Sequence, residues 1–268
     1  MPSLNDSLLI VTDLDGSLLD HHTYSWQPAQ PWLDKLIQHQ LPIVICSSKT
    51  ASEIIVLQQQ LNLSGMPFIS ENGALAQIDL SDFPQPLRRY GGADYASICY
   101  TLAHLRQQHG YKFTGFADVT ANEVAQWTGL APGDAANARL RQASESLIWR
   151  DSQSNFQQFC QHLTLAGLMI TQGGRFWSVM GQESGKGTAL RWLLANYPTH
   201  REGQRITLGL GDGPNDTGML EVVDYAIVIK GHSKKPVQLN RNDDQQVYHT
   251  AAQGPLGWSE GLDFFLSE

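Results

Sequence analysis

The chain has 268 residues, of which 41% are hydrophobic and 16% are charged, and its formal net charge is -8. This length and composition allow one large domain, or a core with a modest second domain, and exclude extended disorder. The acidic balance argues against a nucleic-acid-binding protein, which would need a basic surface for the phosphates. It does not exclude a small anionic substrate, because a bound divalent cation can reverse the local field.

Cysteine spacing and hydropathy limit the cellular context. Cys46, Cys99 and Cys160 are far apart and form no CxxC or Cys/His pattern, so neither a disulfide framework nor a structural zinc site is expected. Nothing approaches the roughly 18 continuous apolar residues of a membrane span, and the N-terminus lacks the basic region of a signal peptide. We therefore expect a protein of the reducing cytoplasm that has no membrane partner.

Short apolar runs bounded by turn residues alternate with helical patterns in both the first and the last third of the chain. The expected buried strands are 8–11, 43–45, 206–208 and 225–229, and the expected helices include 50–61 and 186–197. Continuous apolar strands that alternate with helices indicate a parallel sheet covered on both faces. The predicted core is therefore an α/β fold with a Rossmann-like, doubly wound parallel sheet.

The middle of the chain has a different pattern, which begins at a segment rich in proline and glycine near residue 85. The expected elements there are helices around 94–109, 121–129, 134–145 and 154–166, with short strands at 147–149 and 176–179. This mixture predicts an inserted α+β cap domain. The predicted division is a core at 1–85 and 181–268, interrupted by a cap at 86–180.

Polar clusters follow the predicted core strands, at the edge where parallel α/β sheets bind ligands. Asp13 and Asp15 come directly after the first strand. Alternate residues of an extended segment share a face, so both carboxylates can point toward one site. A solvated turn is the simpler alternative for this cluster taken alone.

The second cluster, Ser47, Ser48 and Lys49, follows the second strand and opens a helix that has a capping-box pattern at its start. Hydroxyls and free backbone N–H groups at a helix N-terminus can bind an anion. An ordinary helix cap is the alternative. Asn72 lies in a further turn after an apolar run, where it could also belong to a simple hairpin.

Two more clusters lie in the last third of the chain. Lys186 opens a helix, where its charge opposes the helix dipole and needs a compensating anion, unless it is simply solvated. Asp212, Asn215 and Asp216 lie in a glycine-rich loop after a strand, and such carboxylate and amide oxygens suit a hard cation.

In this order, an Asp-x-Asp pair, a serine, a lysine and a Gly-Asp-x-x-Asn-Asp loop resemble the motifs of the haloacid dehalogenase superfamily. The resemblance implies that Asp13 is a nucleophile and that Asp15 is the general acid and base. It implies that Ser47 binds the transferring phosphoryl group and that Lys186 neutralises the charge of Asp13 and of the phosphate.

The same resemblance implies a Mg²⁺ cofactor. Its ligands would be the Asp13 carboxylate, the Asp15 backbone carbonyl and Asp212, with Asp216 as a supporting residue of the metal site. Because most of the insertion separates Ser47 from Lys186, the cap is expected to be of the second (C2) type. The implied activity is hydrolysis of a small phosphate ester.

Within this superfamily, the chain is similar to the mannosyl-3-phosphoglycerate phosphatases. The similarity rests on the segments 48–50, 115–118, 125–130, 141–145 and 173–176. It implies a substrate that carries a carboxylate besides its phosphate, and Arg141 and Arg175 are then candidates for binding that carboxylate. Ser144 and Glu145 could bond its hydroxyls. The remaining expected substrate-binding residues are Ser48, Lys49, Asn72, Gly174 and Asn215.

Three alternatives stay open at this point. A broader sugar-phosphate phosphatase would use the same core motifs, because pocket shape decides the substrate. A phosphomutase would use the same two aspartates but return the phosphoryl group to the substrate. A receiver-like phosphoaspartate sensor is less compatible with the second aspartate and with the large cap.

Overall fold

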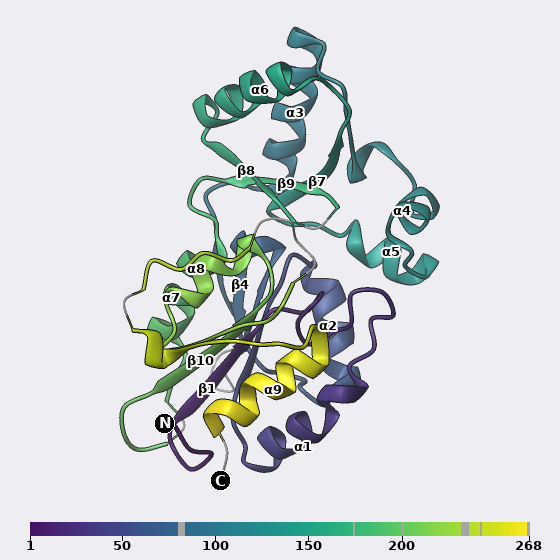
Figure 1. Ribbon diagram of the computed structural model, residues 1–268. Helices are drawn as coiled ribbons and strands as arrows, with labels where there is room; N and C mark the ends of the chain where they lie inside the picture. The colour runs from purple at the N-terminus through teal and green to yellow at the C-terminus, as the bar shows by residue number, and fades with distance from the viewer. Residues whose placement is uncertain (80–83, 174, 200, 232–235, 242, 267–268) are drawn as a thin grey trace.

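The computed structural model of the protein describes residues 1–79, 84–173, 175–199, 201–231, 236–241 and 243–266. Two bodies lie one above the other, a larger one that holds both ends of the chain and a smaller one built from the middle of the chain (Figure 1). Each has its own sheet, with eight strands in the larger body and four in the smaller among the described residues.

The larger sheet has the strand order β12-β11-β10-β1-β2-β3-β4-β5. The strands are β1 (Leu8–Thr12), β2 (Ile43–Cys46), β3 (Phe68–Ser70), β4 (Leu75–Ile78), β5 (Leu87–Tyr90), β10 (Ile206–Gly211), β11 (Tyr225–Val228) and β12 (Val247–His249). The strands from β12 to β3 pair in parallel, and β4 and β5 extend the sheet in antiparallel fashion. The predicted doubly wound α/β core is confirmed.

Helices cover both faces of this sheet (Figure 1). They are α1 (Gln30–Gln38), α2 (Ala51–Gln60), α7 (Lys186–Asn196), α8 (Thr217–Leu220) and α9 (Gly254–Leu266). Side chains of β1 alternate between the two faces of the sheet and so join two separate hydrophobic cores. Ile10 packs with α1, α2 and α9, whereas Leu9 and Val11 pack with α7 and α8. The buried faces of the sheet explain why its strands are apolar without alternation.

The smaller sheet is antiparallel and has the order β6-β7-β9-β8. Its strands are β6 (Phe113–Gly115), β7 (Ser144–Trp149), β8 (Leu168–Gln172) and β9 (Trp177–Gly181). Two long helices, α3 (Tyr95–His109) and α6 (Gln153–Leu165), pack on one face through residues such as Leu102 and Phe159. The shorter α4 (Ala121–Thr128) and α5 (Pro132–Ala138) project from one side (Figure 1).

Short 3-10 turns complete the described elements, at Gln27–Ala29, Glu71–Gly73, Phe116–Asp118, Pro214–Asp216 and Asp244–Gln246. No helix among the described residues is both long and apolar enough to cross a bilayer.

One predicted helix and the predicted start of the cap differ from the structure. The helix expected at 134–145 ends at Ala138, and β7 begins at Ser144. Its continuation is prevented because the backbone N–H groups of Gln142 and Ala143 donate to the carboxylate of Glu71 in the core. In addition, β5 belongs to the larger sheet although it lies beyond residue 85, so we propose that the cap begins after Tyr90.

Candidate active site

Three neighbouring strands bring the predicted motifs to one edge of the core sheet, beneath the cap (Figure 1). The neighbours β10, β1 and β2 are parallel, so their carboxyl ends lie together. Asp13 follows β1 and donates its backbone N–H to Leu210 of β10 at 2.9 Å. Ser47 follows β2, and Asp212 follows β10.

An acidic cluster occupies this edge. Asp13, Asp212 and Asp216 each offer a carboxylate oxygen within 4.8 Å of the others. Lys186, at the first position of α7, places its Nζ atom 2.7 Å from Asp13 Oδ1 and 2.5 Å from Asp216 Oδ1. The Lys186 side chain is only 1% exposed. Three carboxylates around one ammonium leave two negative charges without a counter-ion in the cluster when all are ionised.

The pKa values of the cluster reflect this imbalance. Burial, followed by the charge of Asp216, raises the pKa of Asp13 to about 7. Burial and the charge of Asp13 likewise raise the pKa of Asp212 to about 8. Burial alone would lower the pKa of Lys186, but the two carboxylates beside it outweigh burial and raise it. The lysine therefore stays charged, while Asp13 and Asp212 hold protons up to near-neutral pH.

The acids of the cluster have different environments. Asp216 uses one oxygen for Lys186 and the other for the backbone N–H groups of Asp212 and Gly213, at 3.1 and 2.9 Å. Within the described part of the chain, the side chain of Asp212 accepts one hydrogen bond, from Ser17 at 3.4 Å. A Cβ at Gly16, which has φ of +85°, would lie 2.6 Å from Asp212 Oδ2, so this glycine lets the two loops approach.

Asp15 faces a different cation. Lys49 Nζ lies 3.1 Å from Asp15 Oδ2, and Glu53 of α2 lies 3.9 Å from the same ammonium. The second oxygen, Asp15 Oδ1, is buried and has no hydrogen-bond partner among the described residues. The side chain of Ser47 lies at the base of the same loop, where its Oγ accepts the backbone N–H of Lys49 at 3.2 Å.

Asn72 connects the core loops to the cap. Its backbone N–H donates to Ser47 O at 3.0 Å, and its side chain accepts from Asn215 at 3.3 Å. The same side chain donates to Ser178 Oγ of β9 at 3.2 Å. Ser178 was not singled out from the sequence. The alternation along β9, which buries Trp177 and Val179 against the cap helices, places Ser178 on the opposite face, toward the core.

Two residues that were predicted to contact the substrate instead hold the segment between α5 and β7 (residues 139–143, called the cap linker). Arg141, with a side chain 3% exposed, donates to Ser144 Oγ at 3.0 Å and to the backbone oxygen of Ser48 at 3.2 Å. Ser144 donates to Glu71 at 2.7 Å, and Glu71 lies 3.8 Å from Arg141. These groups satisfy one another, so Arg141 and Ser144 lack a free hydrogen-bonding face toward a ligand.

Other predicted cap residues lie away from the acidic cluster. Glu145 pairs with Val179 in the cap sheet and therefore faces the helices, where it accepts from Ala117 N–H at 2.9 Å. Arg175 donates to the carbonyls of Trp127 and Thr128, at 3.1 and 2.9 Å. The structure thus does not bring Glu145 or Arg175 to the cluster. Gly174 lies outside the described residues.

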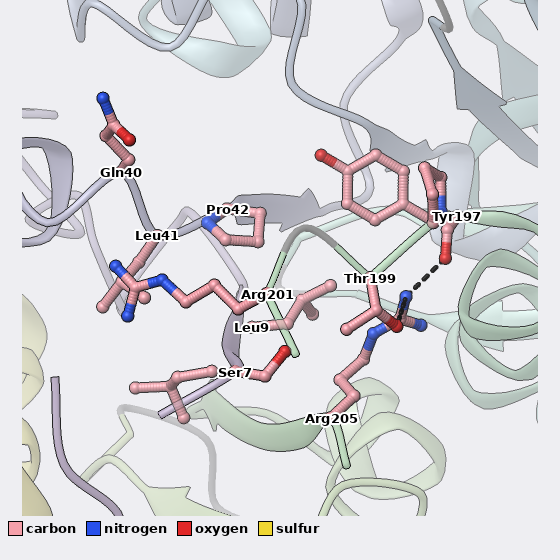
Figure 2. A pocket seen from close by; sticks show the side chains of 11 residues that line it. Ser7, Leu9, Gln40, Leu41, Pro42, Tyr197, Thr199, Arg201 and Arg205 are labelled. Atoms are coloured by element: carbon pink, nitrogen blue, oxygen red, sulfur yellow. Dashed lines mark hydrogen bonds between the residues drawn. The ribbon is translucent and has the colours of Figure 1, made fainter. Parts of the chain in front are cut away.

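A cleft of about 420 Å³ lies between the cap sheet and the core. Lys186 lines it, whereas the three clustered acids Asp13, Asp212 and Asp216 are not among its lining residues. Its core wall includes Asn72, Asn215 and the exposed side of α7, and its cap wall includes residues of β8 and β9. Figure 2 shows a separate, much smaller pocket of about 20 Å³ at the start of β1. There Arg205 donates to the Tyr197 carbonyl and to Thr199, so its guanidinium is already used in contacts within the protein.

Comparison with known families gives two matches. Residues 10–85 match the family described as haloacid dehalogenase-like hydrolase. Residues 107–266, more than half of the chain, match the family described as sucrose-6F-phosphate phosphohydrolase. The chain belongs to the haloacid dehalogenase-like hydrolases, in the sucrose-6F-phosphate phosphohydrolase family.

Solved structures show the same fold at low sequence identity. BT1666 from Bacteroides thetaiotaomicron, a phosphatase of this superfamily, is 19% identical with a TM-score of 0.66, and the match covers 99% of this chain and 98% of that one. The subclass IIB sugar phosphatase BT4131 is 16% identical with a TM-score of 0.64, covering 96% and 98%. Protein 0175 from Thermoplasma acidophilum is 14% identical with a TM-score of 0.67, covering 96% and 97%.

Proposed function

We propose that the protein hydrolyses the phosphate monoester of a sugar or sugar derivative, with Mg²⁺, through an aspartyl phosphate on Asp13. The observation that carries this proposal is the buried cluster of three carboxylates and one lysine, because Lys186 of this cluster also lines a cleft large enough for a sugar phosphate. The family membership supports it, since both matching families are hydrolases.

The donor set fits a divalent cation. With all three acids ionised, the cluster has two more negative charges than positive ones, and its oxygens are the hard ligands that Mg²⁺ prefers. Asp13 and Asp212 would hold the ion, because both oxygens of Asp216 already accept hydrogen bonds. When bound, Mg²⁺ supplies charge neutralisation and polarises the phosphoryl oxygens.

The chain's own residues supply the remaining chemistry. Asp13 attacks phosphorus in line, so that its new bond to phosphorus forms as the bond to the ester oxygen breaks. Asp15, whose Oδ1 has no partner among the described residues, donates a proton to the leaving oxygen. It later accepts a proton from the water that attacks phosphorus, as the bond from phosphorus to Asp13 breaks and inorganic phosphate leaves. Lys186 offsets the charge shared by Asp13 and the phosphate, and Ser47 binds a phosphoryl oxygen.

Within the class of phosphate monoesters, one compound is proposed as the first candidate substrate. Similarity of the segments around Lys49 and the cap to mannosyl-3-phosphoglycerate phosphatases makes mannosyl-3-phosphoglycerate the first candidate. Arg141 and Arg175 no longer support this choice, because their donors are used within the protein. Sucrose 6F-phosphate and simple hexose phosphates are therefore equally necessary as test substrates.

The test is phosphate release, with and without Mg²⁺, from mannosyl-3-phosphoglycerate, sucrose 6F-phosphate, hexose 6-phosphates and p-nitrophenyl phosphate. A kcat/KM for the mannosyl compound that exceeds the others by orders of magnitude would support the narrow substrate. Comparable values would indicate a broader sugar-phosphate phosphatase. Isomerised sugar phosphate without free phosphate would indicate a phosphomutase, and no Mg²⁺-dependent reaction with any ester would contradict the proposal.

A further inference from the structure

One arginine in the cleft has a free guanidinium group. Arg191 lies on the exposed side of α7, five residues after Lys186, and lines the same cleft. Its side chain makes no hydrogen bond or ion pair within the part of the chain that the structure describes. Arg141 and Arg175 contrast with it, because each donates to oxygens of the protein itself.

Arg191 lies farther along α7 than Lys186, and helix geometry gives the separation of the two residues. Lys186 and Arg191 belong to one helix, so five residues place their Cα atoms about 7.5 Å apart along the axis and about 140° apart around it. Lys186 contacts the nucleophile Asp13, whereas Arg191 is exposed. The cleft therefore has one fixed cation at its inner end and another, solvated cation farther along α7.

The wall opposite α7 is only partly polar. Met169 pairs with Met180, and Thr171 pairs with Ser178, so these four side chains share the face of the cap sheet toward the core. Three of them, Met169, Thr171 and Met180, line the cleft. None of these side chains carries a charge. Glu221 of the α8 end also lines the cleft, but one of its oxygens accepts the backbone N–H of Asn240.

We propose that Arg191 binds a second anionic group on the leaving-group end of the substrate. The substrates favoured by this site are phosphate monoesters that carry a carboxylate or a second phosphate several bonds away from the scissile phosphate. A guanidinium suits both groups, because its N–H donors match their paired oxygens. This inference rests on the proposed phosphatase function and adds the chemical class of the substrate and the residue that selects it.

A matched pair of esters tests the selectivity. 6-Phosphogluconate and sorbitol 6-phosphate share a six-carbon chain and differ at the far end, which is a carboxylate in the first and a CH₂OH group in the second. We expect the native protein to have the higher kcat/KM for 6-phosphogluconate. Arg191→Ala should reduce this preference about fivefold to tenfold, mainly through KM, because a charged hydrogen bond at a solvated site is lost. Arg191→Lys should retain part of it.

Arg150→Ala is the matched control, since it removes the same charge from an exposed position at the end of β7, outside the cleft lining. An unchanged ratio in Arg191→Ala, or equal losses on both esters, would overturn the inference. If neither ester is turned over, calorimetric binding of the two esters to the native and Arg191→Ala proteins tests it independently of catalysis. Equal affinities in that measurement would also overturn it, whereas failure of the phosphatase proposal would appear as absent turnover of every ester.

Discussion

Lys49 Nζ lies 3.1 Å from Oδ2 of Asp15, and this contact links the loop after β2 to the Asp-x-Asp segment after β1. Burial alone would lower the pKa of Lys49, but the carboxylates of Asp15 and Glu53 outweigh it and raise the pKa. Lys49 is thus a cation that holds one oxygen of Asp15. The other oxygen, Oδ1, is left for the reaction.

The first prediction concerns this pair. In Lys49→Met, the Asp15 carboxylate loses its fixed partner, and we expect kcat to fall about tenfold to hundredfold, within the range that a positioned acid contributes. Lys49→Arg should recover part of the rate. The Mg²⁺ concentration for half-maximal activity should change little, because Lys49 contacts none of the three clustered acids. Steady-state kinetics over a Mg²⁺ titration measure both quantities, and a native kcat in Lys49→Met would refute the role.

The second prediction separates the role of Asp13 in catalysis from its role in stability. Asp13→Asn should lose at least about 10³-fold in kcat, because no carboxylate remains to attack phosphorus. Burial raises the folded-state pKa of Asp13 to about 7, so the acid favours folding at low pH and loses this contribution as the pH rises through 7. The metal-free variant should therefore melt no lower than the native protein at pH 8.

Circular dichroism melts in chelator at pH 5.5 and pH 8, beside phosphate-release assays, check this prediction. Substantial Mg²⁺-dependent turnover in Asp13→Asn would exclude the assigned nucleophile. A collapse of the melting temperature at pH 8 would show instead that the Lys186 contact outweighs the cost of burying the carboxylate.

The sequence predicts the contacts that follow from the strand pattern, but it does not predict contacts between loops that are distant in the chain. The apolar run at Leu8–Thr12 predicts β1, and the parallel sheet then forces Asp13 and Asp212 together, although 199 positions separate them in the printed sequence. In contrast, the partner of Arg141 could not be read from spacing. Glu71 is distant in the chain, and its turn resembles any hairpin until the cap linker docks on it.

Two short strands of the larger sheet, the interior β3 and the edge strand β5, were also missed for a physical reason. β3 and β5 have three and four residues, and β5 has charged side chains at Arg88 and Arg89. Such segments carry too little periodicity to be distinguished from turns. The core strands were predicted because they are apolar along their whole length. The contacts between the cap and the core were not predicted, because they depend on which face of each cap strand meets the core.

The third prediction concerns metal binding and pH. In the metal-free protein, Asp13 and Asp212 have pKa values raised by burial to about 7 and about 8. Below these values Mg²⁺ must displace protons, so the increase in melting temperature that Mg²⁺ produces should grow between pH 6 and pH 8. The affinity should rise up to about tenfold per pH unit for each displaced proton.

Calorimetric titration with Mg²⁺ in two buffers of different ionisation enthalpy measures the proton release directly. Asp212→Asn should abolish most of the effect, because it removes a proposed ligand and one of the two perturbed acids. A Mg²⁺ effect of equal size at pH 6 and pH 8 would contradict the proposed ligand set.

The fourth prediction concerns the buried carboxylate that holds the cap linker. Glu71 is fully buried and accepts from Gln142 N–H, Ala143 N–H and Ser144 Oγ, at 2.8, 3.2 and 2.7 Å. Glu71→Ala leaves these donors without their acceptor and the buried guanidinium of Arg141 without its counter-ion. The free energy of unfolding should fall by about 3 kcal/mol or more, the cost of breaking a buried ion pair from one side.

Ser144→Ala is the control for this site. It removes one donor to Glu71 and the acceptor of two Arg141 N–H groups but keeps the buried carboxylate, so it should cost less, about 1–2 kcal/mol. Urea denaturation of both variants measures the difference, and limited proteolysis at the linker tests its origin. Because the lost contacts join the linker to the core, faster cleavage near residues 139–143 should accompany the loss in Glu71→Ala. Equal stability of the two variants would mean that water replaces the carboxylate and that the linker is held mainly by Arg141 and its contact with Ser48.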